Sequence, residues 1–323
     1  MKRLAVLTSG GDAPGMNAAT RAVVRTGIAR GFEVFGALHG YRGLLNGEFR
    51  PLGARDVGGI IQLGGTVLGT ARCDELKSEQ GCARALGQLR AQRISTLIVI
   101  GGNGSQTGAW ELQRRGMQVV GVASTIDNDL HGTDVTIGST TAIDVALEAI
   151  DRLRVTAASH NRAFLVEVMG RHSGHLALIA GITGGCEAIV IPEVDVEPEA
   201  IAAQLRDAYA RGKSHALAVV AEGSRYDADA LARYFSEHGE RLGFELRVSR
   251  LGHIQRGATP GAFDRMLATS LGVAAAEAAA AAQFGVVFGW RDGKVAPTPL
   301  ENVAGRTKLA DVGLFYVAQM LAM

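Results

Sequence analysis

The sequence predicts an α/β fold with two lobes, built from mostly parallel sheets with helices on both faces. Short apolar runs alternate with helical patterns along most of the chain, which is typical of strands joined by covering helices. Clusters of glycine and polar residues follow five of these runs, at the place where such sheets bind ligands. The chain has 323 residues, a length that suits two ordinary domains.

The apolar runs and the helical patterns give the order of elements. Strands are expected at residues 4–7, 34–38, 97–100, 119–122, 164–168, 188–191 and 216–221. The clearest helix begins near Ser139, because apolar residues from Ala142 to Leu153 recur at helical spacing. Further helices are expected near residues 16–30, 75–92, 104–115, 173–184, 198–211 and 262–283.

Composition excludes several classes of protein. Lys and Arg number 33 and Asp and Glu 32, so the net charge of +1 indicates neither nucleic acid nor a membrane surface as partner. Cys73, Cys82 and Cys186 lack metal-type spacing and predict free thiols in the reducing cytoplasm. The first apolar run is too short for a signal peptide. Polar residues interrupt the apolar stretch at 273–290, so we do not expect it to form a membrane-spanning helix.

The five clusters are TSGGD, GGNGS, STIDND, MGRHSG and EGSR. Because each follows a predicted strand, we expect all five to lie at one carboxyl edge of a sheet. Gly10 and Gly11 precede a helix, and GGNGS opens another, so helix N-termini could bind a phosphate there. Any single cluster could be only a turn, and TSGGD with the residues after it contains neither a dinucleotide fingerprint nor a Walker-type motif.

Charged residues in and beyond these clusters suggest phosphoryl chemistry. One carboxylate of the pair Asp127 and Asp129 could accept a proton from a hydroxyl while the other helps to hold a cation. An Asx-turn with solvated carboxylates is the alternative. Arginines could bind phosphate oxygens bidentately, although each could also be a surface residue. Arg21 and Arg25 lie four residues apart and fit one solvated helix face.

Taken together, TSGGDAPGMN, TIDNDL with GTDVTIG, EAIDRLR, VEVMGRHSG and LGHIQRG resemble motifs of the bacterial 6-phosphofructokinase family, in order from about residue 2 to 270. The resemblance implies phosphoryl transfer from ATP with Mg²⁺ to the 1-hydroxyl of fructose 6-phosphate, giving fructose 1,6-bisphosphate in glycolysis. It also implies a homotetramer with shared active sites. Residues 1–138 and 251–305 would form the nucleotide-binding lobe, and residues 139–250 and 306–323 the sugar-phosphate-binding lobe.

The resemblance further implies roles for individual residues. The nucleotide would contact Gly11, Tyr41, Arg72, Cys73, Asn103, Gly104, Ser105 and Gly108. The catalytic residues would be Thr125, Asp127 and Arg171, with Asp127 as the general base. The sugar phosphate would contact Thr125, Asp127, Met169, Arg171, Glu222, His253 and Arg256, with Arg162 and Arg247 reaching the site of the neighbouring subunit. An effector, ADP or phosphoenolpyruvate, would bind Arg21, Arg25, Arg154, Glu187, Arg211, Lys213 and His215.

The chain departs from the family pattern at the metal. Asn103 stands where the family has an Asp that serves Mg²⁺, which leaves Asp129 as the carboxylate ligand. An amide brings no charge to a cation that prefers anionic oxygens, so we expect weakened handling of Mg²⁺ and ATP. Gly104 leaves room for adenylate and favours ATP over pyrophosphate as donor.

Two other readings stay open. Gly59, Leu63 and Ser214 stand where the family usually has polar or charged residues near the effector site, so effector binding need not bring regulation. A non-catalytic regulatory subunit or sugar-phosphate sensor is the alternative to an enzyme, and a pyrophosphate-dependent enzyme is a third reading. The retained Asp127 favours the enzyme, because a sensor needs no base.

Overall fold

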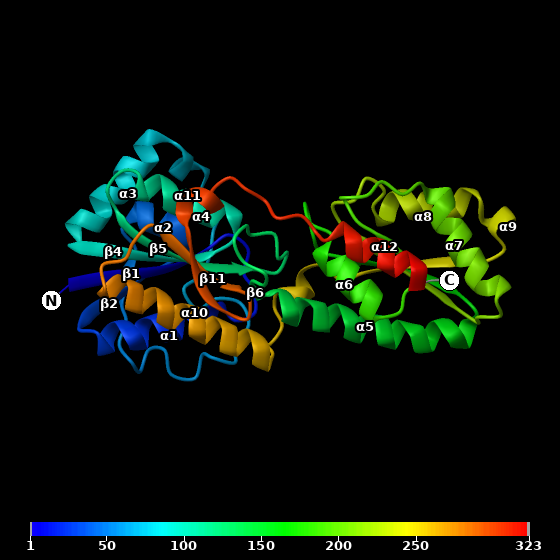
Figure 1. Cartoon of the computed structure of the whole chain (residues 1–323), viewed down its shortest axis with the longest axis horizontal. Coiled ribbons are helices and arrows are strands. Elements are labelled where there is room, and N and C mark those ends of the chain that lie inside the picture. The colour runs from blue at the N-terminus through cyan, green and yellow to red at the C-terminus, as the bar shows by residue number, and fades with distance from the viewer. Residues whose placement is uncertain (1, 322–323) are drawn as a thin grey trace. The chain divides into compact units, whose positions relative to one another are not determined.

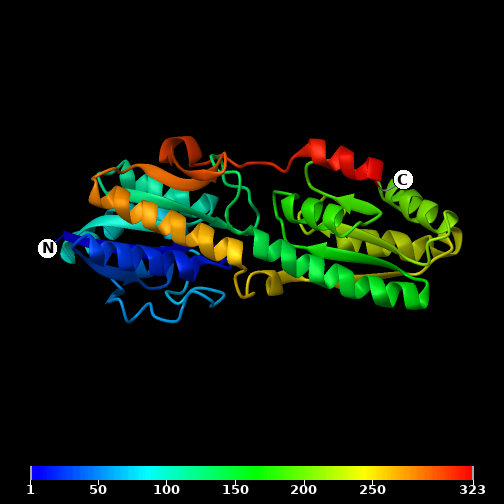
Figure 2. The same cartoon turned by 60° about the horizontal axis from the view of Figure 1, so that its bottom comes forward.

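The computed structural model describes residues 2–321 and contains two compact units (Figures 1 and 2). Unit 1 ends its first segment at Ile126 and also contains Leu130–Thr141 and Arg256–Thr307. Unit 2 consists of Asp127–Asp129, Ala142–Gln255 and the chain from Lys308 onward. The predicted α/β fold of mostly parallel sheets with covering helices is confirmed in both units. No helix among the described residues is long and apolar enough to cross a membrane.

Unit 1 is built on an eight-stranded sheet with the order β12-β11-β5-β4-β1-β2-β3 and with β6 paired to β5. Its inner pairs are parallel, while β3 and β12 run antiparallel at the two edges. The strands are β1 (Lys2–Ser9), β2 (Phe32–Ala37), β3 (Phe49–Pro51), β4 (Ile94–Gly101), β5 (Gln118–Thr125), β6 (Ile137–Gly138), β11 (Val286–Arg291) and β12 (Lys294–Pro299).

Helices cover both faces of this sheet, because its central strands are apolar on both sides. One face carries α1 (Met16–Ala29) and α10 (Ala262–Ala280), which pack against each other (Figure 1). The other face carries α2 (Gly40–Asn46), η1 (Asp74–Lys77), α3 (Glu79–Ala91), α4 (Asn103–Gln113) and α11 (Leu300–Val303). Alternate residues of each strand thus enter two different cores.

Unit 2 contains a four-stranded, wholly parallel sheet with the order β10-β7-β9-β8. The strands are β7 (Ala163–Val168), β8 (Ala188–Val190), β9 (Ala216–Ala221) and β10 (Leu246–Arg250). One face packs on α7 (Pro198–Ala210) and α8 (Ala228–Glu237), which is followed by the short α9 (Gly239–Leu242). The other face carries α6 (His175–Thr183), with α5 (Ser139–His160) and α12 (Val312–Leu321) beside it, and η2 (Gly252–Gln255) follows β10.

All seven predicted strands and the predicted helices are present, but several elements escaped the sequence. The strands β3, β6, β10, β11 and β12 and the helices α2, α8, α9, α11 and α12 were not expected. Most of them are short, and β10 is only half-buried, so its apolar signal is weak. The helix expected at 75–92 is interrupted at Ser78, whose hydroxyl accepts a hydrogen bond from the Gly81 N–H and caps α3.

Four segments lie in a different unit from the lobe predicted for them: residues 127–129 and 251–255 lie in unit 2, and residues 139–141 and 306–307 lie in unit 1. Asp127–Asp129 belongs to unit 2, because the Lys308 N–H donates to the Asp129 carbonyl and Asn128 contacts His175. Residues 251–255 also belong to unit 2, where the Gln255 amide is hydrogen-bonded within that unit. The prediction that all five clusters lie at the carboxyl edge of one sheet is also wrong. Three clusters follow strands of the unit 1 sheet, and the MGRHSG and EGSR clusters follow strands of the unit 2 sheet.

Candidate active site

The TSGGD and GGNGS clusters and the first residues of STIDND meet at the carboxyl ends of β1, β4 and β5 in unit 1. A methyl group on Gly101 would lie 2.5 Å from the Ser105 hydroxyl oxygen and 2.6 Å from the Ser9 carbonyl oxygen. One on Gly102 would lie 3.2 Å from the Thr125 Cβ. Glycine is therefore needed at Gly101 for the strand ends to approach each other. Gly102 is the N-cap of α4, so the N-terminal amides of that helix face the same edge.

Gln106 holds this loop in place, a role that sequence reasoning missed. The side chain is fully buried, and its Nε2 lies 3.2, 3.0 and 3.1 Å from the carbonyl oxygens of Val99, Gly101 and Val122. These carbonyls belong to β4 and β5, so one amide ties the ends of both strands to the first turn of α4. The sequence signalled only a helix start at this position.

Three predicted nucleotide residues lie on or beside the same helix: Gly108 belongs to α4, and Tyr41 and Cys73 pack near it. Tyr41 is buried, its hydroxyl donates to the Ser105 carbonyl at 2.6 Å, and burial raises its pKa well above the usual value. Gly108 lies against the Tyr41 ring, where a methyl group would come within 3.0 Å. Cys73 is half-buried against the same core, and Arg72 is exposed. Tyr41 therefore stabilises the glycine-rich loop through its hydrogen bond to Ser105.

Arg256 lies in unit 1 beside the predicted nucleotide residue Gly11. Its Nη1 donates to the Asp12 carbonyl at 3.1 Å, and a methyl group on Gly11 would lie 2.3 Å from that nitrogen. The side chain thus places a positive charge on the TSGGD loop. Its predicted contact with the sugar phosphate stays a prediction.

Thr125 is held by a buried network of hydroxyl groups. The Thr136 hydroxyl donates to the Thr125 carbonyl at 2.6 Å, and Thr125 pairs with Gly138 in the short β5–β6 ladder. The Gly138 N–H in turn donates to Asp264 at 2.8 Å, and Asp264 also accepts from the Thr141 N–H and hydroxyl. The completely buried Asp264 carboxylate therefore anchors the strand that positions Thr125.

The loop Asp127–Asp129 carries the predicted base and a predicted metal ligand. Asp127 and Asp129 are half-buried, and Asn128 between them is buried with φ 49°, in the left-handed region. The Asn128 Nδ2 lies 3.3 Å from the Nε2 of His175. Burial and the nearby charge of Lys308 lower the pKa of His175 to about 4, so this imidazole is neutral at pH 7.

The carboxyl edge of the unit 2 sheet gathers the predicted sugar-phosphate residues. Met169 and Arg171 follow β7, Glu222 follows β9, and His253 follows β10. Arg171, Glu222 and His253 are exposed. A methyl group on Gly223 would lie 1.8 Å from the Arg171 carbonyl oxygen, so the MGRHSG and EGSR clusters touch.

Buried Gln255 joins this edge together and was not predicted from the sequence. Its Oε1 accepts from the Met169 N–H at 2.8 Å, and its Nε2 donates to the Ala142 carbonyl at 3.2 Å. The residue therefore fixes η2, which carries His253, to the ends of β7 and α5.

Arg162 and Arg247 lie at the opposite end of the same sheet. Arg162 precedes β7, Arg247 pairs with Phe164 in the β10–β7 ladder, and both arginines form ion pairs with Glu245. The six residues of β7 separate Arg162 from Met169, a span of roughly 20 Å at about 3.3 Å per residue. These two arginines do not share an edge with Arg171 or His253 in one chain.

The predicted metal ligands are a half-buried Asn103 in unit 1 and Asp129 in unit 2. Among residues 2–321 no group of three or more His, Cys, Asp or Glu side chains is placed to hold a metal ion. This donor set fits Mg²⁺ only in the manner of nucleotide-dependent enzymes, in which one or two carboxylates and the substrate phosphates bind the cation.

Four of the predicted effector residues come together in unit 2. Glu187 is buried, and its carboxylate accepts from Lys213 Nζ at 2.8 Å and from the Leu217 N–H at 2.6 Å. Burial lowers the pKa of His215, the nearby Glu187 carboxylate raises it, and the cations Arg154 and Lys213 lower it further. The exposed Arg211 follows α7 in the same unit, whereas Arg21 and Arg25 lie on α1 in unit 1.

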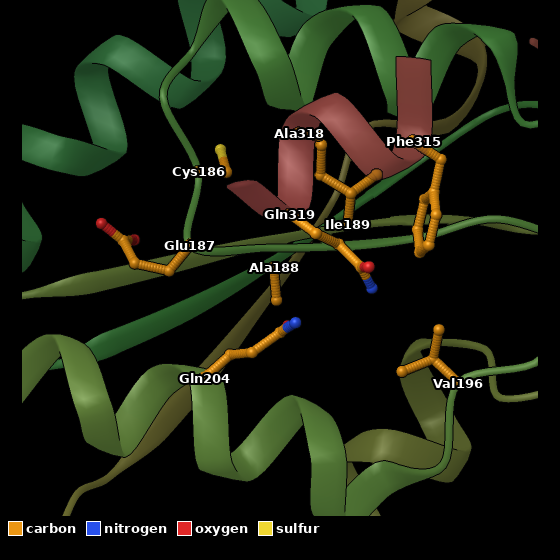
Figure 3. Close-up of a pocket in the computed structure, with 9 residues that line it drawn as sticks. All are labelled: Cys186, Glu187, Ala188, Ile189, Val196, Gln204, Phe315, Ala318 and Gln319. Atoms are coloured by element: carbon orange, nitrogen blue, oxygen red, sulfur yellow. The ribbon is translucent and has the colours of Figure 1, made fainter. Parts of the chain in front are cut away.

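A pocket beside Glu187 is bounded by α7, β8 and α12, with Gln204 and Gln319 pointing into it (Figure 3). Its cavity volume of about 10 Å³ is far below the roughly 300–1,000 Å³ that is usual for small-molecule sites. We therefore assign it no ligand.

Comparison with known proteins identifies the family. The model of the family described as phosphofructokinase matches residues 3–279. The chain belongs to the phosphofructokinase family. A Thermus thermophilus protein named ATP-dependent 6-phosphofructokinase 1 is 52% identical over 324 residues, covering 100% of both chains. A Thermotoga neapolitana protein named ATP-dependent 6-phosphofructokinase is 47% identical, again over the whole of both chains.

The fold of this phosphofructokinase family member is also that of a solved structure. The phosphofructokinase of Saccharomyces cerevisiae superposes with a TM-score of 0.85 at 39% identity. The superposition covers 94% of this chain and 45% of the yeast chain. The resemblance read from the sequence motifs is thereby confirmed.

Proposed function

We propose that this chain catalyses ATP-dependent phosphorylation of fructose 6-phosphate at its 1-hydroxyl, giving fructose 1,6-bisphosphate. The observation that carries the proposal is identity of 43–52% over the full chain to proteins named ATP-dependent 6-phosphofructokinase. The alternative of a non-catalytic sensor is less well supported, because both carboxylates of the Asp127 loop are present. The named relatives also favour ATP over pyrophosphate.

The edge of unit 1 would bind the nucleotide. Its glycines allow the backbone to approach phosphates, and the α4 N-terminus and Arg256 supply positive potential. Gly104 is exposed, and nothing lies within 4 Å of the position of a Cβ there, which leaves space for adenylate. Gly11, Arg72, Cys73, Ser105 and Gly108 complete the proposed set, with Tyr41 supporting Ser105.

The edge of unit 2 would bind fructose 6-phosphate and supply the base. Asp127 would accept the proton of the 1-hydroxyl as its oxygen attacks the γ-phosphorus, and ADP would leave. Arg171 and Thr125 would offset negative charge on the transferring group. Met169, Glu222 and His253 would hold the sugar phosphate at the same strand ends.

Magnesium would be held by Asp129 together with the nucleotide phosphates, with Asn103 as a weak oxygen donor. When bound, this cation neutralises phosphate charge. The missing carboxylate at Asn103 removes one anionic ligand, and a single charge at ~4 Å is worth about 4 kcal/mol at an effective dielectric of ~20. We therefore propose that Mg²⁺ handling is weaker here than in a site with two carboxylates.

The change Asn103→Asp tests the weakened metal site. We expect kcat to rise about tenfold or more and half-maximal activity to need less Mg²⁺, because about 1.4 kcal/mol corresponds to a tenfold change in rate. Calorimetry should also show tighter binding of Mg²⁺ with ATP. The control is Asn161→Asp, which adds the same charge at an exposed loop. Equal rates and equal Mg²⁺ demand in the native protein and Asn103→Asp would contradict the prediction.

The assembly would be a homotetramer with shared active sites. Arg162 lies roughly 20 Å from the end of β7 that precedes Arg171, and Arg247, which pairs with Phe164, lies about 13 Å from it, so both would reach the sugar phosphate of a neighbouring subunit. An effector such as ADP or phosphoenolpyruvate would use the cations around Glu187, together with Arg211, Arg21 and Arg25. The free thiols of Cys73, Cys82 and Cys186 are consistent with the cytoplasm, which we propose as the location.

A coupled assay tests the activity directly. The purified chain is supplied with fructose 6-phosphate and either ATP or pyrophosphate, and formation of fructose 1,6-bisphosphate is followed. We expect turnover with ATP and none with pyrophosphate. Turnover with pyrophosphate alone would overturn the choice of donor, and sugar-phosphate binding without turnover in the native chain and in Asn103→Asp would favour the sensor.

A further inference from the structure

We propose that His175 is a positioning residue for the reaction, holding the loop Asp127–Asp129 through the side chain of Asn128. This inference rests on the proposed function, because it assigns Asp127 as the base. It concerns unit 2 alone, to which the loop, His175 and Lys308 all belong.

The loop needs such support because of its backbone conformation. Asn128 has φ 49°, a left-handed conformation that asparagine tolerates better than most residues but that remains uncommon. The residue is 4% exposed, so its side-chain amide requires partners within the protein. Because Asp127 and Asp129 flank it directly, the orientation of Asn128 decides where both carboxylates point.

His175 supplies a partner from a rigid element. It is the first residue of α6, whose N-cap is Gly174, and its own N–H lies 3.4 Å from the Ser173 hydroxyl oxygen. A methyl group on Gly174 would lie 2.3 Å from the Ile191 side chain, so the backbone beside His175 is tightly packed. The imidazole Nε2 is 3.3 Å from Asn128 Nδ2.

The direction of this hydrogen bond follows from chemistry. An amide nitrogen can only donate, so the Nε2 of His175 must be unprotonated and accept, with the proton on Nδ1. The low pKa of this half-buried imidazole agrees with that tautomeric state at neutral pH. The Lys308 N–H, which donates to the Asp129 carbonyl at 2.7 Å, holds the other side of the loop.

The position of this loop should affect the rate of catalysis. Phosphoryl transfer depends mainly on positioning, and a displacement of about 1 Å can cost on the order of 100-fold in rate. Removal of the acceptor at position 175 would break the hydrogen bond that ties the Asn128 amide to α6, and the loop would then be able to turn. Ligand contacts made by the glycine-rich loops and by arginines would persist, so kcat should fall while KM changes little.

The test compares His175→Leu, which removes the acceptor, with His175→Gln, whose side-chain oxygen can accept from Asn128. We expect His175→Leu to lower kcat 10- to 100-fold with KM for both substrates within about threefold, and His175→Gln to recover most of the loss. The control is His160→Leu, because His160 is exposed at the end of α5. Unchanged kcat in His175→Leu, or equal losses in the two His175 variants, would overturn the proposal.

A crystal structure of His175→Leu separates this inference from the proposed function. We expect the Asn128 backbone to leave the left-handed region or its side chain to turn away from α6. A loop that keeps its conformation would overturn the positioning role whatever the activity. Absence of ATP-dependent turnover in the native chain would instead overturn the proposed function.

Discussion

The three thiols of this chain differ in their access to solvent. Cys73 is half-buried beside the predicted nucleotide loop, whereas Cys82 and Cys186 are buried. Burial raises the pKa of Cys82, and it raises the pKa of Cys186 to about 12. Because the thiolate is the reactive form, the two buried thiols should be inert at neutral pH.

Iodoacetamide labelling should therefore modify Cys73 first. We expect ATP with Mg²⁺ to slow this labelling severalfold, since the proposed nucleotide site includes Cys73. Peptide mass spectrometry after timed labelling measures the rate at each cysteine. Labelling of Cys186 as fast as that of Cys73 would contradict the burial argument, and unchanged labelling in the presence of ATP would place the nucleotide elsewhere.

The neutral His175 should also make stability depend on pH. Its pKa falls from 6.5 in the unfolded chain to about 4 in the fold, so the unfolded chain binds more protons between these values. The contribution of His175 to the free energy of unfolding is therefore fully present above pH 6.5 and is lost as the pH falls toward 4. The total loss is on the order of 3 kcal/mol. Urea unfolding at pH 7 and pH 5 should show a smaller loss in His175→Gln than in the native chain.

Among single residues, the sequence indicated the polar residues that could contact a ligand, but it did not indicate the buried residues that hold the loops in place. Asp127, Arg171 and His253 stand out because polar residues follow apolar runs. Gln106, Gln255 and Asp264 carry no such signal, because a buried amide or carboxylate has meaning only once its backbone partners are known. Those partners lie 113 or more residues away for Asp264 and for one contact of Gln255.

At the scale of elements, the start of α5 depends on a side chain from α10. Asp264 accepts hydrogen bonds from the N–H groups of Gly138 and Thr141 and from the Thr141 hydroxyl, all within 2.8 Å. A carboxylate at this helix N-terminus also interacts favourably with the helix dipole. The same residue fixes β6, the short strand that pairs with Thr125.

The change Asp264→Asn should lower the free energy of unfolding by about 2–4 kcal/mol, because an amide group would face two donors in a buried site. It should also lower kcat, since Thr125 loses its support. Chemical denaturation and steady-state kinetics measure the two effects. Asp292→Asn at an exposed turn is the control, with an expected change within about 0.5 kcal/mol. A native-like stability would show that the hydrogen bonds at Asp264 are dispensable.

The elements that the sequence predicted are those with strong periodicity. The fully buried β9 and the almost fully buried β4 read as continuous apolar runs, and α5 shows a clear apolar face. The edge hairpin of β11 and β12 and the half-buried β10 alternate weakly with polar residues. Pairing to neighbouring strands, which sequence does not display, stabilises them.

At the scale of the whole molecule, the separation of Arg162 from Met169 along β7 agrees with the proposal that two subunits contribute to each site. Mixing inactive Arg162→Ala with inactive Asp127→Asn during refolding or co-expression should restore activity, because some sites would then combine intact residues from two subunits. Coupled assays on the mixed and the separate variants measure this. Mixed assemblies that stay inactive would show that each site is built from a single chain.

The sequence by itself determined the fold class, the order of the long elements and the loops proposed to form the active site, because burial periodicity and glycine placement are local properties. Only the tertiary structure decided that the five clusters divide between two sheets, that Asp127–Asp129 belongs to unit 2, and that Arg162 and Arg247 lie at the opposite strand end. Strand order and hydrogen bonds between residues far apart in the chain fix these features, and no short stretch of sequence encodes them.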